Sequence, residues 1–223
     1  IYNRTGTSWS QEAYIKAENN DASDNFGYSV SLHGDTLAVG AYQEDSNQTT
    51  ITNGTTASTD DSNSASGAVY VYKRTGTSWA QEAYIKAANN DASDQFGSSI
   101  SVDGNTLVVG SYLEASNQTT ITNGTSASSD DSSSASGAVY IYKRTGTSWA
   151  QEAYIKAANN DESDQFGMSV SIDEDKIVVG ANQEDSDQTT ISNSTSTSSD
   201  DSNGDSGAVY VYPLTNSSPS AQD

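Results

Sequence analysis

The sequence predicts an all-β protein, a β-propeller-like array of three four-stranded antiparallel blades. The first reason is internal repetition, because the chain of 223 residues copies itself at a period of 70, as Trp9, Trp79 and Trp149 show. The second reason is a series of short segments in which polar and apolar residues alternate, with no helical periodicity anywhere. One such repeat cannot bury its own apolar faces, so we expect the core to form between neighbouring repeats.

Two strands joined by a tight turn open each repeat. In the first copy, residues 28–32 alternate as a half-buried strand does, and a second strand of small and apolar residues follows at 36–41. We place the turn at His33-Gly34, and at Asp103-Gly104 and Glu174-Asp175 in the later copies. The Phe-Gly pair before each first strand is expected to fill the space between adjacent sheets.

A polar insert separates these two strands from two more. In the first copy it spans residues 42–66, is rich in Ser, Thr, Asn, Asp and Gln, and holds one candidate short strand at 49–52. The third strand, 67–72, alternates aromatic and β-branched residues, a pattern that suits a surface packed on both sides. The fourth strand, 78–87, completes the blade.

The repeats form one predicted domain, residues 1–212, with repeats at about 18–87, 88–157 and 158–212, followed by a polar tail at 213–223. The last repeat stops after its third strand, whereas residues 8–17 form a fourth strand with no inner strands before it. We therefore expect this N-terminal strand, from the same or a neighbouring chain, to complete the last blade. The assembly strand would contribute Trp9, Gln11, Ala13 and Ile15. Because the sequence opens inside a strand copy, we also expect an upstream piece that lies outside it.

Composition restricts the partners. The formal net charge of −21 repels nucleic acid and anionic lipid, so we expect neither as a ligand. No apolar run approaches the ~20 residues of a membrane-spanning helix, so membrane insertion is not expected. The chain has no cysteine, which excludes disulfides.

Acidic loops before the third strand are the candidate metal sites. Calcium takes six to eight oxygen ligands from carboxylates, amides and carbonyls. The candidate ligands are Asp201, Asn203 and Asp205, which alternate around Gly204, and Asp61, Asn63 and Asp131 in the earlier copies. The alternative interpretation of these loops is a solvated acidic surface.

Glycosylation is a second candidate modification of the surface. Asn-x-Ser/Thr triplets, most of them in the polar inserts, occur at Asn3, Asn47, Asn53, Asn117, Asn123, Asn193 and Asn216. Glycans would fit these exposed segments.

Catalysis is not expected. The Asp pairs beside each Phe-Gly, such as Asp21 and Asp24, are copied in every repeat, and a pair copied in this way is better explained as scaffold than as general acid and base. His33 is the only histidine and stands at a turn. No phosphate-binding glycine loop is present.

The repeats resemble the FG-GAP repeat family, whose best-known relatives form the integrin alpha-subunit propeller. The residues that carry the resemblance are Phe26-Gly27 with Gly40-Ala41, Phe96-Gly97 with Gly110-Ser111, and Phe166-Gly167 with Gly180-Ala181. The third and fourth strands resemble the bacterial and archaeal extracellular branch. The resemblance implies a propeller fold, an extracellular or cell-surface location and calcium bound in an Asp-rich turn. In this chain the proline of the motif is replaced and that turn is too short for a calcium cage.

These observations lead to a main hypothesis, an extracellular structural or adhesive protein that associates with its own copies, as a homo-oligomer or polymer, into a surface layer or filament. A calcium-dependent module that binds a cell-surface protein or a glycan is the alternative. A hydrolase or accessory domain is a third possibility that the repeat symmetry does not favour.

Overall fold

The computed structural model describes residues 1–195 and 197–214, and within them it confirms an all-β protein of antiparallel sheets without a helix. No described residue therefore belongs to a long apolar helix that would cross a membrane. The strands are β1 (Tyr2–Thr5), β2 (Ser8–Gln11), β3 (Ser29–His33), β4 (Thr36–Ala41), β5 (Thr52–Asn53), β6 (Ala68–Thr75), β7 (Ser78–Ile85), β8 (Ser99–Asp103), β9 (Thr106–Ser111), β10 (Thr122–Asn123), β11 (Ala138–Thr145), β12 (Ser148–Ile155), β13 (Ser169–Asp173), β14 (Lys176–Ala181) and β15 (Ala208–Pro213).

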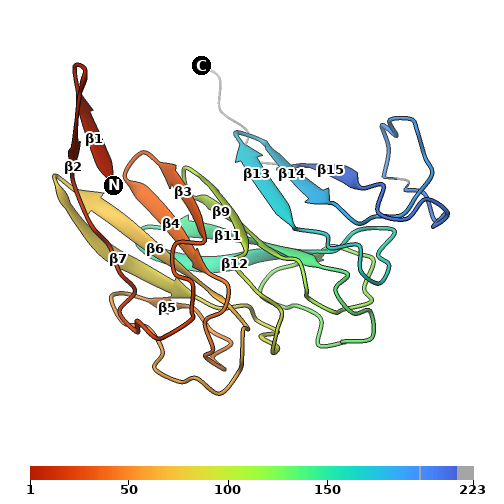
Figure 1. Ribbon diagram of the computed structural model, residues 1–223, viewed down its shortest axis with the longest axis horizontal. Coiled ribbons are helices and arrows are strands. Elements are labelled where there is room, and N and C mark those ends of the chain that lie inside the picture. Colours follow the sequence, from red (N-terminus) through yellow and green to blue (C-terminus); the bar gives the residue numbers. More distant parts are fainter. Residues whose placement is uncertain (196, 215–223) are drawn as a thin grey trace, which may run out of the picture.

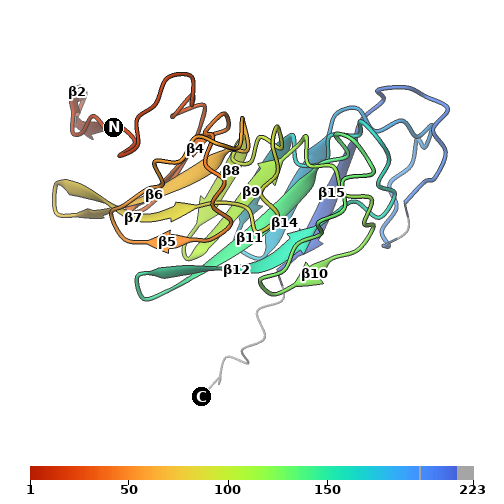
Figure 2. The same ribbon diagram turned by 90° about the horizontal axis from the view of Figure 1, so that it is seen from below.

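Three sheets follow one another along an open arc. The first has the strand order β3-β4-β6-β7-β5, the second β8-β9-β11-β12-β10 and the third β13-β14-β15. The hairpin of β1 and β2 lies at one end of the arc and the third sheet at the other (Figure 1). Seen from below, the sheets stack side by side (Figure 2). The arc is not closed into a ring within the described chain.

The strand boundaries follow the sequence pattern closely, with two corrections. The turn between β3 and β4 lies at Gly34-Asp35, one residue later than His33-Gly34, because His33 pairs with Thr36 in the sheet. Gly34 has a φ of 56°, a left-handed conformation that glycine adopts freely. The second correction concerns the insert, whose short strand is Thr52–Asn53 and adds a fifth strand outside β7. The two complete blades therefore have five strands each.

Apolar side chains from adjacent sheets form the core. Phe96 is fully buried and belongs to the same cluster as Val69 and Ile85 of the first sheet and Tyr140 of the second. Its ring meets the ring of Tyr140 edge to face, with centroids 5.2 Å apart. Phe166 repeats this arrangement between the second and third sheets. The expectation that the Phe-Gly pair fills the space between sheets is confirmed.

The leading segment differs from its expected form. Only residues 8–11 of the expected strand 8–17 are in a strand, and they pair with β1 of their own hairpin. The following residues run past the first sheet, where the hydroxyl of Tyr72 donates to the carbonyl of Lys16. Among the described residues, β15 pairs only with β14. The chain therefore does not complete its own last blade with its N-terminal strand.

Backbone crowding between sheets generates the first prediction. An added Cβ at Gly110 would lie 2.1 Å from the carbonyl oxygen of Gly167 in the next sheet, whereas at Gly180 the nearest atom is the side-chain oxygen of Ser169, at 2.4 Å. We expect Gly110→Ala to lower the free energy of unfolding by roughly 1–3 kcal/mol, because backbone atoms of two sheets must separate. Gly180→Ala, the matched control, should cost less because a serine side chain can rotate. Urea unfolding measures both, and equal losses would contradict the prediction.

Candidate assembly site

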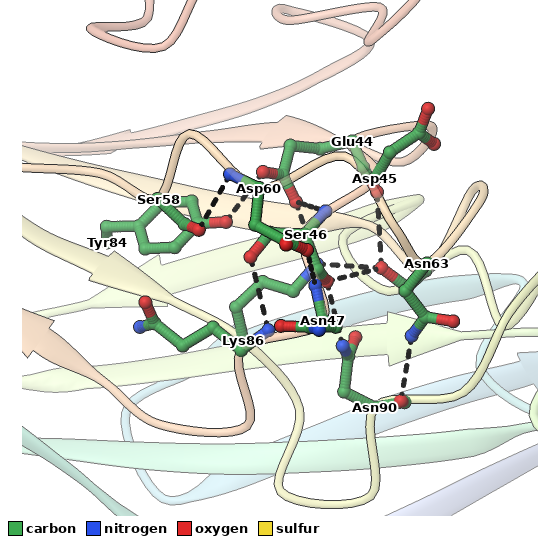
Figure 3. Close-up of polar contacts among 12 residues, drawn as sticks. Glu44, Asp45, Ser46, Asn47, Ser58, Asp60, Asn63, Tyr84, Lys86 and Asn90 are labelled. Carbon is green, nitrogen blue, oxygen red and sulfur yellow. Dashed lines mark hydrogen bonds and ion pairs between the residues drawn. The ribbon is translucent and has the colours of Figure 1, made fainter.

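A buried ion pair ties the start of each polar insert to the outer strand of its blade. In the first sheet, Nζ of Lys86 lies 2.7 Å from Oε2 of Glu44, and the two side chains are 0% and 1% exposed. The hydroxyl of Tyr84 donates to Oε1 of Glu44 at 2.7 Å, and Lys86 also donates to Oγ of Ser66 at 2.8 Å. Figure 3 shows Lys86 and Tyr84 converging on Glu44. Burial lowers the pKa of Lys86, which the carboxylate of Glu44 partly offsets.

The second sheet repeats this network. Nζ of Lys156 lies 2.8 Å from Oε2 of Glu114, and the hydroxyl of Tyr154 donates to Oε1 of the same carboxylate at 2.8 Å. Asn89, from the turn that enters the sheet, donates to Glu114 at 3.0 Å. Every polar atom of this buried carboxylate thus has a partner, as a buried charge requires.

The third sheet contains only the acidic half of the network. Glu184 is 4% exposed and accepts hydrogen bonds from Nδ2 of Asn159 at 2.8 Å and from Oγ of Ser186 at 3.0 Å. No lysine or tyrosine from an outer strand reaches it within the described residues. The equivalent tyrosine and lysine are Tyr14 and Lys16, which lie at the opposite end of the arc and are both exposed.

The apolar faces of the sheets are likewise covered in the middle of the arc and exposed at its two ends. Val139 and Ile141 of β11 are buried against the third sheet, whereas the equivalent Val209 and Val211 of β15 are 69% and 60% exposed. At the other end of the arc Leu32 is exposed as well. Beside it, Ala13 and Ile15 of the leading segment, with residues of β3 and β4, line a hollow of about 580 Å³.

The structure places the predicted assembly residues along one ribbon. Trp9 and Gln11 are exposed on β2, whereas Ala13 and Ile15 are half-buried beyond it. In the second sheet the equivalent Trp149 is almost fully buried, and its Nε1 donates to Glu82 of the first sheet at 3.0 Å. Trp9 is exposed because no sheet of the described chain packs against that end of the arc.

The predicted metal ligands do not form a cage. No group of three or more acidic or histidine side chains lies at metal-binding distance among the described residues. Asp205 accepts a hydrogen bond from Gln183, and the side-chain amide of Asn63 donates to the carbonyl of Asn90. Asp61 and Asp201 are exposed on their loops. The turn between the first two strands, where the resemblance implies calcium, has two residues and does not fit the ion.

Asp131 differs from the other candidate metal ligands because it lines a surface hollow together with further aspartates. With Asp91 and Asp94 it lines a surface hollow of about 410 Å³ in the second repeat. Asp94 is 4% exposed, and its Oδ2 has no hydrogen-bond partner. Burial, with the carboxylates of Glu114 and Asp91 nearby, raises the pKa of Asp94 to about 8.

The candidate glycosylation sites in the described chain are all exposed, and Asn216 lies outside the described residues. Asn53 has a structural role as well, because its side chain accepts a hydrogen bond from the backbone N–H of Trp149 and donates to its carbonyl. A glycan on Asn53 would break this contact between the first and second sheets.

Sequence reasoning missed the buried ion pair. In the sequence, Glu44 stands beside Asp45 at the start of a polar insert, where an exposed acidic loop is the simpler prediction. The signal that identifies the pair is recurrence of a lone lysine in an otherwise apolar strand end, Tyr-Ile-Lys-Ala, together with a glutamate at the same place in every insert.

The ion pair generates the second prediction. We expect Lys86→Met to destabilise the chain by roughly 3–5 kcal/mol, because Glu44 would remain buried without its cation. Lys176→Met is the matched control, since Lys176 pairs with Asp175 at a site where both side chains are 62% exposed. The control should change stability by less than about 1 kcal/mol. Chemical denaturation measures both variants, and similar losses would show that the buried pair has no special role.

The pKa of Asp94 generates the third prediction. Its folded value of about 8 lies above the ordinary value of 3.8, so folding favours the protonated carboxyl. The stability that this group contributes is complete below about pH 4 and is lost as the pH rises to about 8, by up to roughly 1.4 kcal/mol per pH unit. We expect Asp94→Asn to flatten this fall in thermal unfolding between pH 5 and 9. Parallel curves for the two proteins would contradict the assignment.

Comparison with known proteins agrees with this geometry. A family model for the FG-GAP repeat matches residues 9–56, 79–142 and 149–212. A search of curated proteins finds no match. The three matches cover most of the chain, and each contains one Phe-Gly pair and the first two strands of one sheet, so the chain belongs to the FG-GAP repeat family.

Proposed function

We propose that this chain is a non-enzymatic extracellular structural or adhesive protein whose copies associate by strand complementation into a cell-surface assembly or filament. The observation that carries the proposal is complementarity between the two ends of the arc. One end has a sheet whose β15 edge is unpaired among the described residues. The other has residues 8–17, which match the outer strand of a blade in sequence and of which residues 8–11 pair with β1.

The surface supports the same function. FG-GAP repeats are typically extracellular domains. The inserts of the three repeats are polar and mostly exposed, and a net charge of −21 keeps such a surface solvated and discourages unspecific contact between copies. Association would then depend on the two apolar ends of the arc.

The test is the fourth prediction. Sedimentation velocity over a range of concentrations, at a salt concentration that screens the net charge, should show oligomers that increase with concentration. Val211→Lys should abolish them, because it places a charge on the exposed apolar face of β15. Ile191→Lys is the matched control, since Ile191 is 88% exposed on the third insert and should not affect association. A wild-type protein that stays monomeric at every concentration would refute the proposal.

A calcium-dependent module that binds a glycan or surface protein is the second candidate. The favouring observation is the hollow lined by Asp91, Asp94 and Asp131, in which Asp94 has an unpartnered oxygen. Calcium binding there requires these side chains to come closer together. The same sedimentation experiment separates the candidates, because strand complementation does not need calcium and should survive a chelator.

A further inference from the structure

In each of the first two sheets a buried glutamate holds both a lysine and an asparagine side chain. We propose that the chain forms an intramolecular amide bond between Nζ of Lys86 and Cγ of Asn19, and the equivalent bond between Lys156 and Asn89, each with release of ammonia. The glutamate of each site would transfer the protons. This activity is separate from the proposed self-association and does not depend on it.

The glutamate carboxylate bridges the two reacting groups. In the first sheet, Nζ of Lys86 donates to Oε2 of Glu44 at 2.7 Å, and Nδ2 of Asn19 donates to Oε1 of the same carboxylate at 3.0 Å. All three residues are buried. The amine and the carboxamide therefore flank one base that touches both the nucleophile and the leaving nitrogen, as transfer of an acyl group between two nitrogen atoms requires.

A tyrosine hydroxyl polarises the carboxamide. The hydroxyl of Tyr70 donates to Oδ1 of Asn19 at 2.5 Å, so a donor already lies where negative charge would develop during the attack. Burial raises the pKa of Tyr70, which keeps this hydroxyl protonated. The two bonds of Asn19 also fix its orientation, because the nitrogen of the amide faces the carboxylate and the oxygen faces the tyrosine.

The lysine has the setting of a nucleophile. Burial lowers the pKa of Lys86 and so favours the neutral amine, and the adjacent carboxylate of Glu44 can accept the proton that the ammonium loses. The attack requires Nζ to approach Cγ of Asn19 to about 3–3.5 Å. The flexible four-carbon side chain of lysine allows this movement along the carboxylate.

The reaction balances without a further reactant. The ammonium of Lys86 gives one proton to Glu44, and the neutral nitrogen bonds to Cγ of Asn19 while an electron pair of the C=O bond moves to Oδ1. Glu44 then protonates Nδ2, the C=O bond re-forms, and the Cγ–Nδ2 bond breaks with loss of ammonia. Glu44 finally takes a proton from the new amide nitrogen and passes it to the ammonia, which leaves as ammonium.

The second sheet contains the same four groups. Nζ of Lys156 donates to Oε2 of Glu114 at 2.8 Å, and Nδ2 of Asn89 donates to Oε1 at 3.0 Å. The hydroxyl of Tyr140 donates to Oδ1 of Asn89 at 2.6 Å. The two sites are therefore independent copies of one arrangement, and each can be tested against the other.

The third sheet supplies an internal reference. Glu184 accepts a hydrogen bond from Nδ2 of Asn159 at 2.8 Å, and the hydroxyl of Tyr210 donates to Oδ1 of Asn159 at 2.8 Å. No lysine reaches this carboxylate within the described residues. Asn159 should therefore keep its carboxamide while Asn19 and Asn89 lose theirs.

The two bonds would tie the start of each repeat to its end. Asn19 lies in the turn that enters the first sheet, Lys86 directly follows the outer strand β7, and Asn89 stands three positions after Lys86. A tensile load along the chain would therefore pass through the amide bonds and bypass the strands of both sheets. The chain has no cysteine for a disulfide in this role, and an amide bond also resists reduction.

The first test is the intact mass of the full chain, measured after denaturation. The wild-type mass should fall short of the mass calculated from the sequence by two molecules of ammonia. Lys86→Arg and Lys156→Arg keep the cation but provide no lysine amine, so each should restore one ammonia. A wild-type chain with the full calculated mass overturns the proposal.

Peptide mapping then locates the bonds. Trypsin does not cleave after an acylated lysine, so the digest should contain a branched peptide that includes both Asn19 and Lys86. The pairs Asn53-Gly54 and Asn123-Gly124 can also lose ammonia, by cyclising on their own backbone, but this reaction joins no peptides. Ammonia loss confined to such pairs would overturn the proposal.

Removal of one hydroxyl tests the mechanism separately from the fold. Tyr70→Phe should slow formation of the first bond by about a hundredfold in chains purified in denaturant and then allowed to fold. Tyr72→Phe is the matched control, because both rings of β6 meet Phe26 edge to face but the Tyr72 hydroxyl donates to the carbonyl of Lys16 instead.

Thermal unfolding checks that both tyrosine variants fold. A branched peptide that forms slowly in Tyr70→Phe and at the wild-type rate in Tyr72→Phe supports the assigned mechanism. Equal rates in the two variants would exclude the Tyr70 hydroxyl from the reaction and overturn that mechanism.

Discussion

The structure depends on close approach between the backbones of successive sheets. Gly40 and Gly110 face carbonyl groups of the next sheet with no room for a side chain, and Phe96 and Phe166 fill the space beside them. This spacing brings the valines and isoleucines of facing strands into one core. It also leaves each sheet incomplete alone, because an apolar face that a neighbour covers in the middle of the arc is exposed at its ends.

The buried glutamate and lysine of a sheet fix the register of its outer strand. Burying two charges costs desolvation free energy that their attraction only partly returns, so the pair contributes specificity more clearly than stability. Glu44 and Lys86 join the first residues of a polar insert to the outer strand of the same blade. The outer strand is thereby held in one register, since a shift would bury each charge without its partner. Glu184 presents the same requirement at the end of the arc.

Much of the fold was predictable from the sequence, because the polar and apolar pattern of each strand is local and the repeat of 70 residues is periodic. The run of small and apolar residues located β4 to the residue, and the repeat indicated that Phe96 and Phe166 meet neighbouring sheets. The candidate site was predicted less well. Acidic loops suggested metal ligands, yet Asp205 and Asn63 bond to nearby backbone and amide groups, and the informative carboxylates, Glu44, Glu114 and Glu184, are buried. Whether a charged residue is buried depends on the segments that pack over it. Composition and spacing do not indicate which segments those are.

The sequence alone determined the repeat and the strands within it. It also determined that the last repeat lacks a fourth strand while residues 8–17 resemble one, because all of these follow from the order of residues along the chain. Only the tertiary structure decided how that mismatch is resolved. It showed that residues 8–11 pair in a hairpin with β1, at the opposite end of the arc from β15, because the sheets stack outward and hold the two ends apart. Distance in space, which no periodicity encodes, separates Lys16 from Glu184.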